Sequence, residues 1–484
     1  MPVIYALSHV PPEVSAYGMA KYSRSSASMR DSLLELSQQK AEAFLNTFYF
    51  AYGHASIADL AHVPLAIEEI SLLAAMEIVD EPLWDGQERS TRYQDFSESP
   101  FYTPESASAQ YEAGIQTLFR LYRSLFSEAG GIVRERWPKP DDMKSGAYGR
   151  TIRARAFDLA RYALPLATLT SLGQVTNARV LEQQIRRLMA SPLKEVRDIA
   201  LGMKAAVTHE EPFNLLEARL RHLDIPIDDR ALREMNPGAI APTLTKYTDA
   251  DQYLLERRDR LRAIVKSQFT GVSPANPGVV LHVLENPLDD LLAGLIYGES
   301  HLSYHDVLDR LLSLTASEKN DMLGEILQRR GRHDAWPREM QQRPLIFDVT
   351  VDVGAFRDLN RHRRLDKVLQ AVDPTLGYDM PPEIAELPLA GHYNAALSRH
   401  YESLKDHPAD ERPYLLPLAS LRRVLLRMDF AEAAYLIELR SRSSGHFSYR
   451  RIANQMFEAL KFRFPTVADA VRVTPMTAFD PFER

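Results

Sequence analysis

Apolar and polar residues alternate strictly over residues 345–353. Phe347, Val349 and Val351 share one parity, whereas Asp348 and Thr350 share the other. Successive side chains of a strand point to opposite faces of a sheet. This stretch is therefore predicted to be a strand with its apolar face in a core and its polar face in solvent or in a site.

Similar patterns predict elements elsewhere, and their order recurs along the chain. We expect strands over 3–7 and 279–283, helices over about 107–127 and 177–189, and an exposed loop over 130–149. Such recurrence indicates a tandem duplication. We predict an α/β fold of the α+β type in two copies, residues 1–222 and 279–484, each a mainly antiparallel sheet flanked by helices. A linker over 223–278 should contain a helix at about 248–268. Two unrelated α/β domains are the alternative.

Composition narrows the possible functions. The 484 residues are 45% hydrophobic and 25% charged, with a net charge of −7, which is typical of a globular protein and argues against general nucleic-acid binding. The absence of cysteine excludes disulfides, thiolate metal sites and a cysteine nucleophile. No secretory signal and no apolar run long enough to span a bilayer is seen, so we expect a cytoplasmic protein without a membrane partner.

A basic run, Arg-His-Arg-Arg, occupies residues 361–364 shortly after the predicted strand. Three guanidinium groups beside an imidazole favour an anionic ligand such as a phosphate, a flavin or a nucleotide. The alternative is a solvated helix start whose cations pair with Asp358 and Asp366.

A second group of cations is predicted on one face of the helix over 177–189. Arg179, Gln183 and Arg187 recur every four residues, so they share a stripe that suits a phosphate, a pyrimidine edge or a flavin ring. A solvated helix face paired with nearby acids is equally compatible with this spacing. Ser90 and Arg92 could hold a phosphate through a hydroxyl, a backbone N–H and a guanidinium, although this signal alone is weak.

These motifs together resemble the flavin-dependent thymidylate synthases, and they are divided between the two copies. The first copy keeps Gly53-His54-Ala55-Ser56, Glu88, Ser90, Arg92, Tyr93, Ala160-Arg161, Leu164-Pro165, Asn177-Ala178-Arg179 and Arg187. The second copy keeps Arg361-His362-Arg363, Leu416-Pro417 and Leu439-Arg440. Asp80-Glu81-Pro82 replaces the first Arg-His-Arg, and Asp429-Phe430-Ala431 replaces the second Asn-Ala-Arg. What one copy has lost, the other retains.

The resemblance implies a cofactor, a substrate and an assembly. FAD would be bound by Arg361, His362, Arg363, Asn177, Arg179, Gln183, His54 and Ser56. Deoxyuridine monophosphate (dUMP) would be bound by Glu88, Ser90, Arg92, Arg161, Arg187 and Arg440, with Arg187 and Ser90 in catalytic roles. NADPH and methylenetetrahydrofolate would be co-substrates, and no metal is expected. Because the family builds its sites between the subunits of a tetramer, we expect a homodimer that forms a pseudo-tetramer.

The implied reaction needs no enzyme thiolate, because the reduced flavin carries the methylene group and supplies the hydride. The complementary losses further predict one composite flavin site per chain, in which Arg361-His362-Arg363 of the second copy meets Asn177 and Arg179 of the first. In place of a glutamine that the family has before Arg-His-Arg, this chain has Glu77 and Asp358. A different pyrimidine nucleotide, uridine in a polynucleotide, and a non-catalytic flavin- or nucleotide-binding relative therefore stay open.

Overall fold

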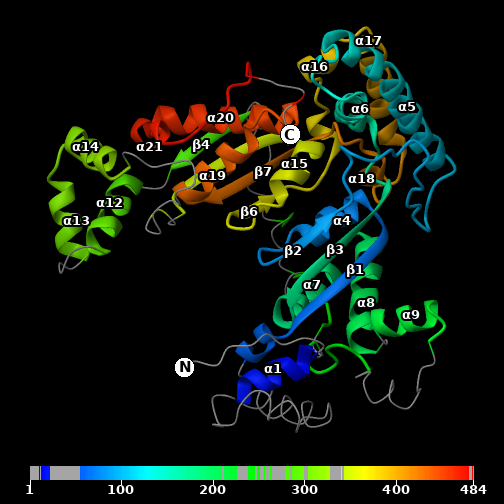
Figure 1. Cartoon of the computed structure of the whole chain (residues 1–484), viewed down its shortest axis with the longest axis horizontal. Coiled ribbons are helices and arrows are strands. Elements are labelled where there is room, and N and C mark those ends of the chain that lie inside the picture. The colour runs from blue at the N-terminus through cyan, green and yellow to red at the C-terminus, as the bar shows by residue number, and fades with distance from the viewer. Residues whose placement is uncertain are drawn as a thin grey trace. The chain divides into compact units, whose positions relative to one another are not determined.

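The computed structural model describes residues 10, 12–21, 55–209, 212–225, 238–245, 248–250, 255–256, 259, 262–263, 278–283, 286–298, 304–327, 340, 343–478 and 482 (Figure 1). The strand predicted over 3–7 lies outside these residues, as does most of the helix predicted at about 248–268.

The chain forms two compact units. Unit 1 comprises Met1–Ile70, Glu77–Glu88 and Thr170–Ser273, and unit 2 comprises Ser71–Met76, Arg89–Leu169 and Pro274–Arg484. Unit 2 therefore combines residues from both of the copies that the sequence predicts. The boundaries of those copies remain a prediction.

Unit 1 contains a three-stranded sheet in the order β1-β3-β2, formed by β1 (His62–Ser71), β2 (Asp85–Glu88) and β3 (Leu169–Asn177). Strand β2 runs antiparallel to β3, with Glu88 opposite Leu172. The helices are α1 (Pro12–Lys21), η2 (Ala55–Leu60), α7 (Ala178–Met189), α8 (Lys194–Thr208) and α9 (Leu215–His222), and α4 (Leu72–Val79) follows β1 along the chain.

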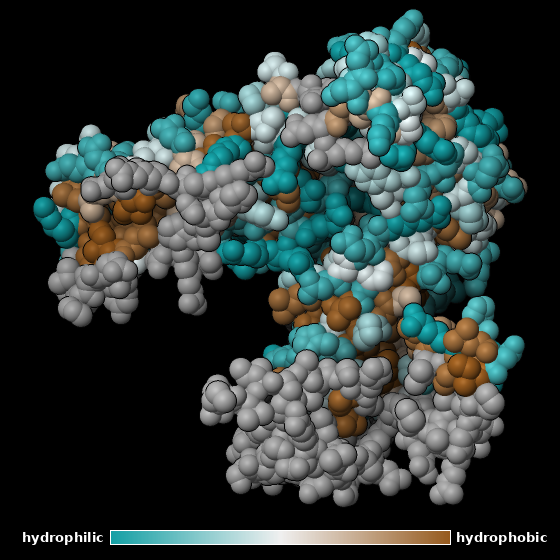
Figure 2. Space-filling view, viewed as in Figure 1, coloured by the Kyte–Doolittle hydropathy of each residue, from teal (hydrophilic) through white to brown (hydrophobic). Residues whose placement is uncertain are grey.

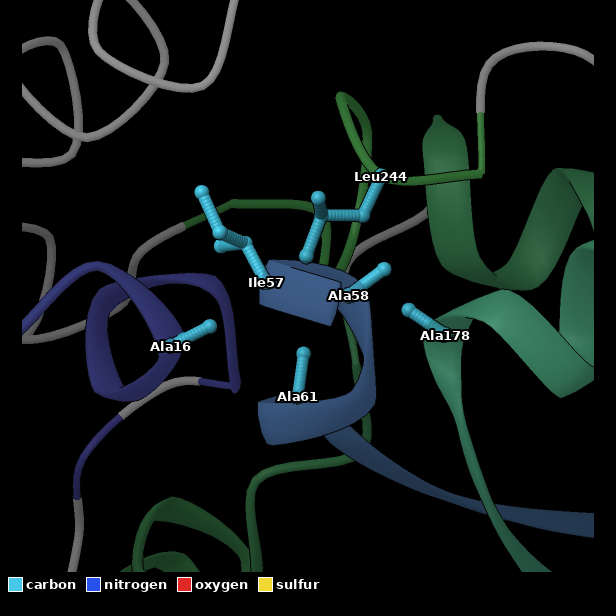
Figure 3. Close-up of a cluster of buried hydrophobic side chains, with 6 residues drawn as sticks. All are labelled: Ala16, Ile57, Ala58, Ala61, Ala178 and Leu244. Carbon is cyan, nitrogen blue, oxygen red and sulfur yellow. The ribbon is translucent and has the colours of Figure 1, made fainter. Parts of the chain in front are cut away.

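A cluster of small buried side chains fixes the start of α7 in unit 1 (Figure 3). Its members are Ala16, Ile57, Ala58, Ala61, Ala178 and Leu244. Alanine side chains allow the backbones to approach closely, and the N–H of Ala178 donates to the carbonyl of Ala61 over 2.8 Å. Asn177 caps the helix, because its side chain accepts a hydrogen bond from the N–H of Val180.

Unit 2 contains a four-stranded sheet in the order β4-β5-β7-β6, in which all neighbours are antiparallel. Its strands are β4 (Val279–Val283), β5 (Leu345–Asp352), β6 (Asp366–Leu369) and β7 (Leu421–Met428). Strand β5 is confirmed, and burial alternates over its first five residues: Phe347 is fully buried and lies opposite the buried Leu426, whereas Thr350 and Asp352 farther along are buried as well. On the polar face, Asp348 accepts two hydrogen bonds of 2.8 Å from Arg423.

Helices make up most of the rest of unit 2. They are α5 (Tyr111–Arg136), α6 (Ser145–Ala160), η3 (Arg161–Ala163), α12 (Pro287–Gly298), α13 (Tyr304–Leu312), α14 (Ala316–Leu327), α15 (Val353–Asn360), η5 (Pro374–Leu376), α16 (Pro382–Ala385), α17 (Ala390–Ser403), η6 (Leu404–Asp406), α18 (Arg412–Leu415), α19 (Phe430–Arg440), α20 (Phe447–Arg463) and α21 (Pro465–Asp469). Figure 2 shows hydrophobic surface over α12 to α14, where Leu312 and Ile326 are exposed. Among the described residues, no helix has both the length and the apolar composition needed to cross a bilayer.

The loop predicted over 130–149 is largely wrong. Helix α5 continues to Arg136, and α6 already begins at Ser145. The apolar stripe persists beyond the glycines, because Leu125, Ala129 and Val133 are all buried at helical spacing. Packing of this stripe overrides the low helix propensity of Gly130 and Gly131.

Three strands of each sheet share one topology, which confirms the predicted fold class. In unit 2, β5, α15, β6, β7 and α19 follow one another along the chain in the same way as β1, α4, β2, β3 and α7. The strand orders β1-β3-β2 and β5-β7-β6 also agree. Asp429 caps α19 by accepting from the N–H of Glu432, just as Asn177 caps α7. An Asp in place of Asn therefore keeps the capping function.

Candidate functional site

Unit 2 gathers five arginines around two aspartates, a group that we name the arginine cluster. Its members are Arg92, Arg155, Arg161, Arg361, Arg440, Asp158 and Asp358. They come from the turn after β2, from α6 and η3, and from the ends of α15 and α19. Among these groups, positive charge exceeds negative charge by three.

Asp158 holds one half of the cluster. Arg92 donates to its carboxylate from Nε over 2.6 Å and from Nη2 over 3.0 Å, and Arg155 donates over 3.3 Å. Burial alone would raise the pKa of Asp158, but the bidentate contact with Arg92 outweighs burial and holds this pKa well below its usual range. Arg92 also donates to the hydroxyl of Tyr449 over 3.1 Å. Asp158 therefore carries a stable negative charge and fixes Arg92.

Asp358, on the last turn of α15, holds the other half. Arg361 donates to its carboxylate over 2.6 Å, whereas Arg161 and Arg440 lie 3.8 and 3.9 Å from it. Arg440 also donates to the backbone carbonyl of Asp358 over 2.7 Å. Burial opposes ionisation, yet the three guanidiniums lower the pKa of Asp358 to about 2. The protein thus places its own anion among these cations.

Arg161 is the least satisfied member of the cluster. Its side chain is buried, with the whole residue 2% exposed, and its Nε and Nη2 have no hydrogen-bond partner among the described residues. Its closest carboxylate oxygen is the Asp358 oxygen at 3.8 Å, which is beyond hydrogen-bond distance. Unpaired buried donors of a charged group are costly, so this guanidinium is suited to an anion that is not part of the chain.

His362 joins the cluster to Glu432. The Nε of Arg440 donates to Nε2 of His362 over 3.0 Å, and Nδ1 of His362 lies 2.8 Å from the Glu432 carboxylate. Because a guanidinium can only donate, Nε2 must accept, and the ring proton must sit on Nδ1 and be donated to Glu432. Burial lowers the pKa of His362, which keeps the ring neutral. This chain of contacts orients Arg440.

His446 and Tyr449 complete the wall beside Asp158. His446 caps α20 by accepting from the N–H of Ser448, so its Nε2 carries the proton and donates to the carbonyl of Asp158 over 3.0 Å. Burial and the nearby Arg161 hold the pKa of His446 well below its usual value. The guanidinium carbon of Arg440 lies 5.4 Å from the centre of the Tyr449 ring, a cation–π contact.

The predicted site residues of unit 1 form a separate set of contacts. Asp59 holds Arg179 through both carboxylate oxygens, and Arg187 donates to the carbonyl of Glu77 over 3.0 Å and to Glu81 over 3.4 Å. Gln183 is exposed. Both arginines of the predicted stripe are therefore paired with acids of the same unit.

The remaining predicted site residues are Glu88, Ser90, Arg363, His54 and Ser56. Glu88 lies at the end of β2, and Ser90 accepts a hydrogen bond from the N–H of Arg92 over 3.2 Å. Arg363 is exposed. His54 and the side chain of Ser56 lie outside the described residues. The described side chains include no group of three or more His, Cys, Asp or Glu residues that could hold a metal ion.

The chain matches the model of one protein family over two segments. The model of the thymidylate synthase complementing proteins matches residues 7–213 and 293–466. The chain belongs to this family. The family predicted from the divided motifs is thus confirmed, and the model matches two separate segments, as a tandem arrangement requires.

Two relatives match nearly the whole length of the chain. The "UPF0159 protein" of Chlamydia muridarum is 27% identical over 492 residues, which cover 94% of this chain and 88% of the relative. The "UPF0159 protein Ta1429" of Thermoplasma acidophilum is 27% identical over 497 residues, covering 94% of each.

Two solved structures show a more partial likeness. The flavin-dependent thymidylate synthase ThyX of Helicobacter pylori, complexed with FAD and dUMP, is 18% identical and covers 41% of this chain and 89% of its own, with a TM-score of 0.25. The UMP/dUMP methylase PolB of Streptomyces cacaoi, bound with 5-Br dUMP, is 12% identical and covers 43% of this chain and 97% of its own, with a TM-score of 0.29. These scores are too low to transfer any detail of a site.

Four of the residues predicted to bind flavin already have partners. Asp59 holds Arg179, Glu432 holds His362, and Asp358 holds Arg361. Asn177 caps α7. At these four residues, FAD would have to exchange with internal partners. Since the residues fall in both units, the composite flavin site remains a prediction.

Arg155 and Asp158 of the arginine cluster, and His446 and Tyr449 beside it, were absent from the predicted site. Together with the predicted Arg161, Arg155 and Asp158 recur every third residue along α6 and η3, and this spacing could have indicated that Asp158 lies between two arginines. His446 and Tyr449 carry no comparable local signal, because their partners lie far away in the sequence.

Proposed function

We propose that unit 2 binds the 5′-phosphate of a pyrimidine nucleotide, with dUMP as the first candidate, as the substrate of a thymidylate-synthase-like methyl transfer. The observation that carries the proposal is the buried Arg161 guanidinium, whose Nε and Nη2 have no hydrogen-bond partner among the described residues. Family membership supports the reaction class.

The charges of the arginine cluster suit such a ligand. A phosphate monoester carries a charge of about −1.5 to −2 at neutral pH, which the excess of positive charge in the cluster is large enough to neutralise. Its oxygens can accept hydrogen bonds from Arg161 and Arg361 once they displace Asp358, which now lies between these groups. Arg92 stays paired with Asp158 and adds positive charge nearby. Binding is therefore an exchange in which the ligand's anion replaces an internal one. Arg440, held by His362, would be free to polarise a pyrimidine carbonyl.

The cofactor part of the proposal is FAD, which would carry the methylene group from methylenetetrahydrofolate to C5 of dUMP and supply the hydride, with NADPH as reductant. Because the predicted flavin contacts are paired internally, FAD binding needs its own test. A homodimer in the cytoplasm, with two chains supplying four copies, belongs to the same proposal.

A nucleotide-binding protein without flavin chemistry is the second candidate. The observation that favours it is the pairing of Arg179, His362 and Arg361 with acids. Uridine in a polynucleotide is a weaker candidate, since the net charge of −7 opposes binding to nucleic acid.

Two measurements separate these functions. Calorimetric titration should show that dUMP binds and that deoxyuridine, which lacks the phosphate, binds at least tenfold more weakly; equal affinities would contradict the phosphate site. Release of tritium from [5-³H]dUMP is then measured with FAD, NADPH and methylenetetrahydrofolate. Release that depends on all three supports methyl transfer. Tight dUMP binding without release and without FAD uptake identifies the second candidate. UMP and dCMP, run in parallel, test a different pyrimidine substrate.

A further inference from the structure

Unit 2 contains a pocket of about 210 Å³ outside the ring of contacts around Asp358. It is lined by residues of α5, α6, α16 and α20 (Figure 1). Trp137 and Phe447 supply aromatic surface, and Ile132, Leu159 and Leu387 supply aliphatic surface. An apolar cavity of about 150 Å³ can hold benzene, so this pocket has room for a flat molecule of one or two fused rings.

The arginines that line the pocket do not favour an anion, because each already has an acceptor. Arg450 donates from Nε to the carbonyl of Ser441 over 3.0 Å and from Nη2 to the carbonyl of Pro475 over 2.9 Å. Arg136 donates to Glu386 over 3.1 Å, and Arg155 donates to Asp158 over 3.3 Å. The guanidinium groups of the lining are therefore already hydrogen-bonded to acceptors within the protein.

Glu383 differs from these arginines in its hydrogen bonding. Its Oε2 is buried and has no hydrogen-bond partner among the described residues, and the residue lines the pocket. Burial raises the pKa of Glu383, which shows how poorly its charge is solvated. An N–H donor placed in the pocket would satisfy this oxygen.

We propose that this pocket binds a small flat heterocycle of one or two rings that packs against Trp137 and Phe447 and donates a hydrogen bond from an amino group to Glu383. Asp158 lines the same pocket and also holds Arg92. A molecule bound there would therefore lie beside the residue that fixes Arg92 of the arginine cluster. The pocket is a site for a second small molecule next to the nucleotide.

The test uses two flat probes, 3-aminoquinoline and quinoline, which are both uncharged at pH 8 and differ in the amino donor. Calorimetric titration of the full-length protein at this pH should show that 3-aminoquinoline binds about tenfold or more tightly than quinoline, as expected for a hydrogen bond to a charged acceptor. Glu383→Leu should abolish this preference. Trp137→Leu should weaken both probes and preserve the preference. Arg161→Met changes a residue of the proposed phosphate site that does not line the pocket, so it should leave both affinities unchanged.

Equal binding of the two probes to the unmodified protein, or no binding of either, would overturn the proposal without any variant. A preference that survives in Glu383→Leu, with circular dichroism showing a folded protein, would also overturn it. Loss of the preference in Arg161→Met would place the probes beside Arg161, which does not line the pocket, and would reject the pocket.

Discussion

Replacing Arg161 by Met should separate stability from ligand binding. Methionine keeps an unbranched apolar side chain of similar length and removes the charge and all donors. Without a ligand, the substitution removes an attraction to Asp358 at 3.8 Å, about 4 kcal/mol at an effective dielectric constant of about 20. It also removes two unfavourable contributions to the folded state. These are the desolvation cost of a buried cation, several kcal/mol, and the cost of two unpaired donors, about 1–3 kcal/mol each.

Asp358 remains paired in this variant, because Arg361 still donates to it over 2.6 Å. The variant therefore leaves no unpaired buried charge, which is the usual reason why breaking a buried pair is destabilising. We expect the ligand-free protein to be between unchanged and about 4 kcal/mol more stable. Affinity for dUMP should fall at least tenfold, since a charge-assisted hydrogen bond contributes about 1.5–3 kcal/mol.

Urea denaturation followed by circular dichroism gives the stability, and calorimetry gives the dUMP affinity. Arg451→Met is the matched control, because Arg451 donates to Asp379 over 2.6 Å and lies outside the arginine cluster. The control should lose about 1–3 kcal/mol of stability and keep its dUMP affinity. If Arg161→Met unfolds more than about 2 kcal/mol more easily and still binds dUMP normally, Arg161 is a structural residue and our account of it is wrong.

Further predictions follow from the same contacts. Asp358→Asn removes the internal competitor, so the affinity for dUMP should rise several-fold in calorimetry, and a weaker affinity would contradict the exchange of anions. His362 should show the Nδ1–H tautomer in ¹⁵N NMR, because Arg440 donates to Nε2, and an Nε2–H tautomer would reject the chain of contacts. Glu432→Leu removes the acceptor of the His362 proton, so dUMP affinity should fall as Arg440 loosens, and an unchanged affinity would contradict a role of Glu432 in orienting Arg440. Burial lowers the pKa of His362 and His446, so protons bind more readily to the unfolded state below about pH 6.5. Stability should consequently drop by up to about 1.4 kcal/mol per histidine per pH unit as the pH falls from 6.5 towards 5.5, and a flat urea profile would argue against neutral buried rings. FAD titration should reach saturation at one flavin per chain, whereas two equivalent flavins would exclude the composite site.

Local patterns predicted the elements with a strong period. Strand β5 was predictable because Phe347 and Val349 share a buried face with the residues opposite them. The N-terminus of α7 was predictable from Asn177, a residue that caps helices well. The end of α5 was not, since Gly130 and Gly131 suggest a break and only tertiary packing keeps them helical.

The candidate site was predictable only in part, because its partners are distant in sequence. The basic run at 361–364 indicated either an anion site or pairing with Asp358, and the structure shows the pairing of Arg361 with Asp358. Arg92 meets Asp158 and Tyr449 only through tertiary folding, which periodicity does not report. Glu432 gave no signal either, because its role depends on the burial of His362.

The internal carboxylates explain how this protein keeps so many guanidiniums in place without a ligand. Asp158 holds Arg92, Asp358 holds Arg361, and Asp59 in unit 1 holds Arg179. Each pair limits the cost of a partly buried cation, but each also lowers the gain from an external anion, since a ligand must first displace the carboxylate.

Arg161 differs from these paired arginines, because its Nε and Nη2 lack any acceptor in the described part of the chain. A phosphate near Arg161 has to displace only Asp358. That carboxylate stays paired with Arg440 and Arg361 only when no stronger anion competes for them. Selectivity should therefore depend on charge: a dianionic phosphate can replace one carboxylate, whereas a neutral nucleoside cannot. The phosphate and the Asp358 carboxylate therefore compete for the same guanidinium groups.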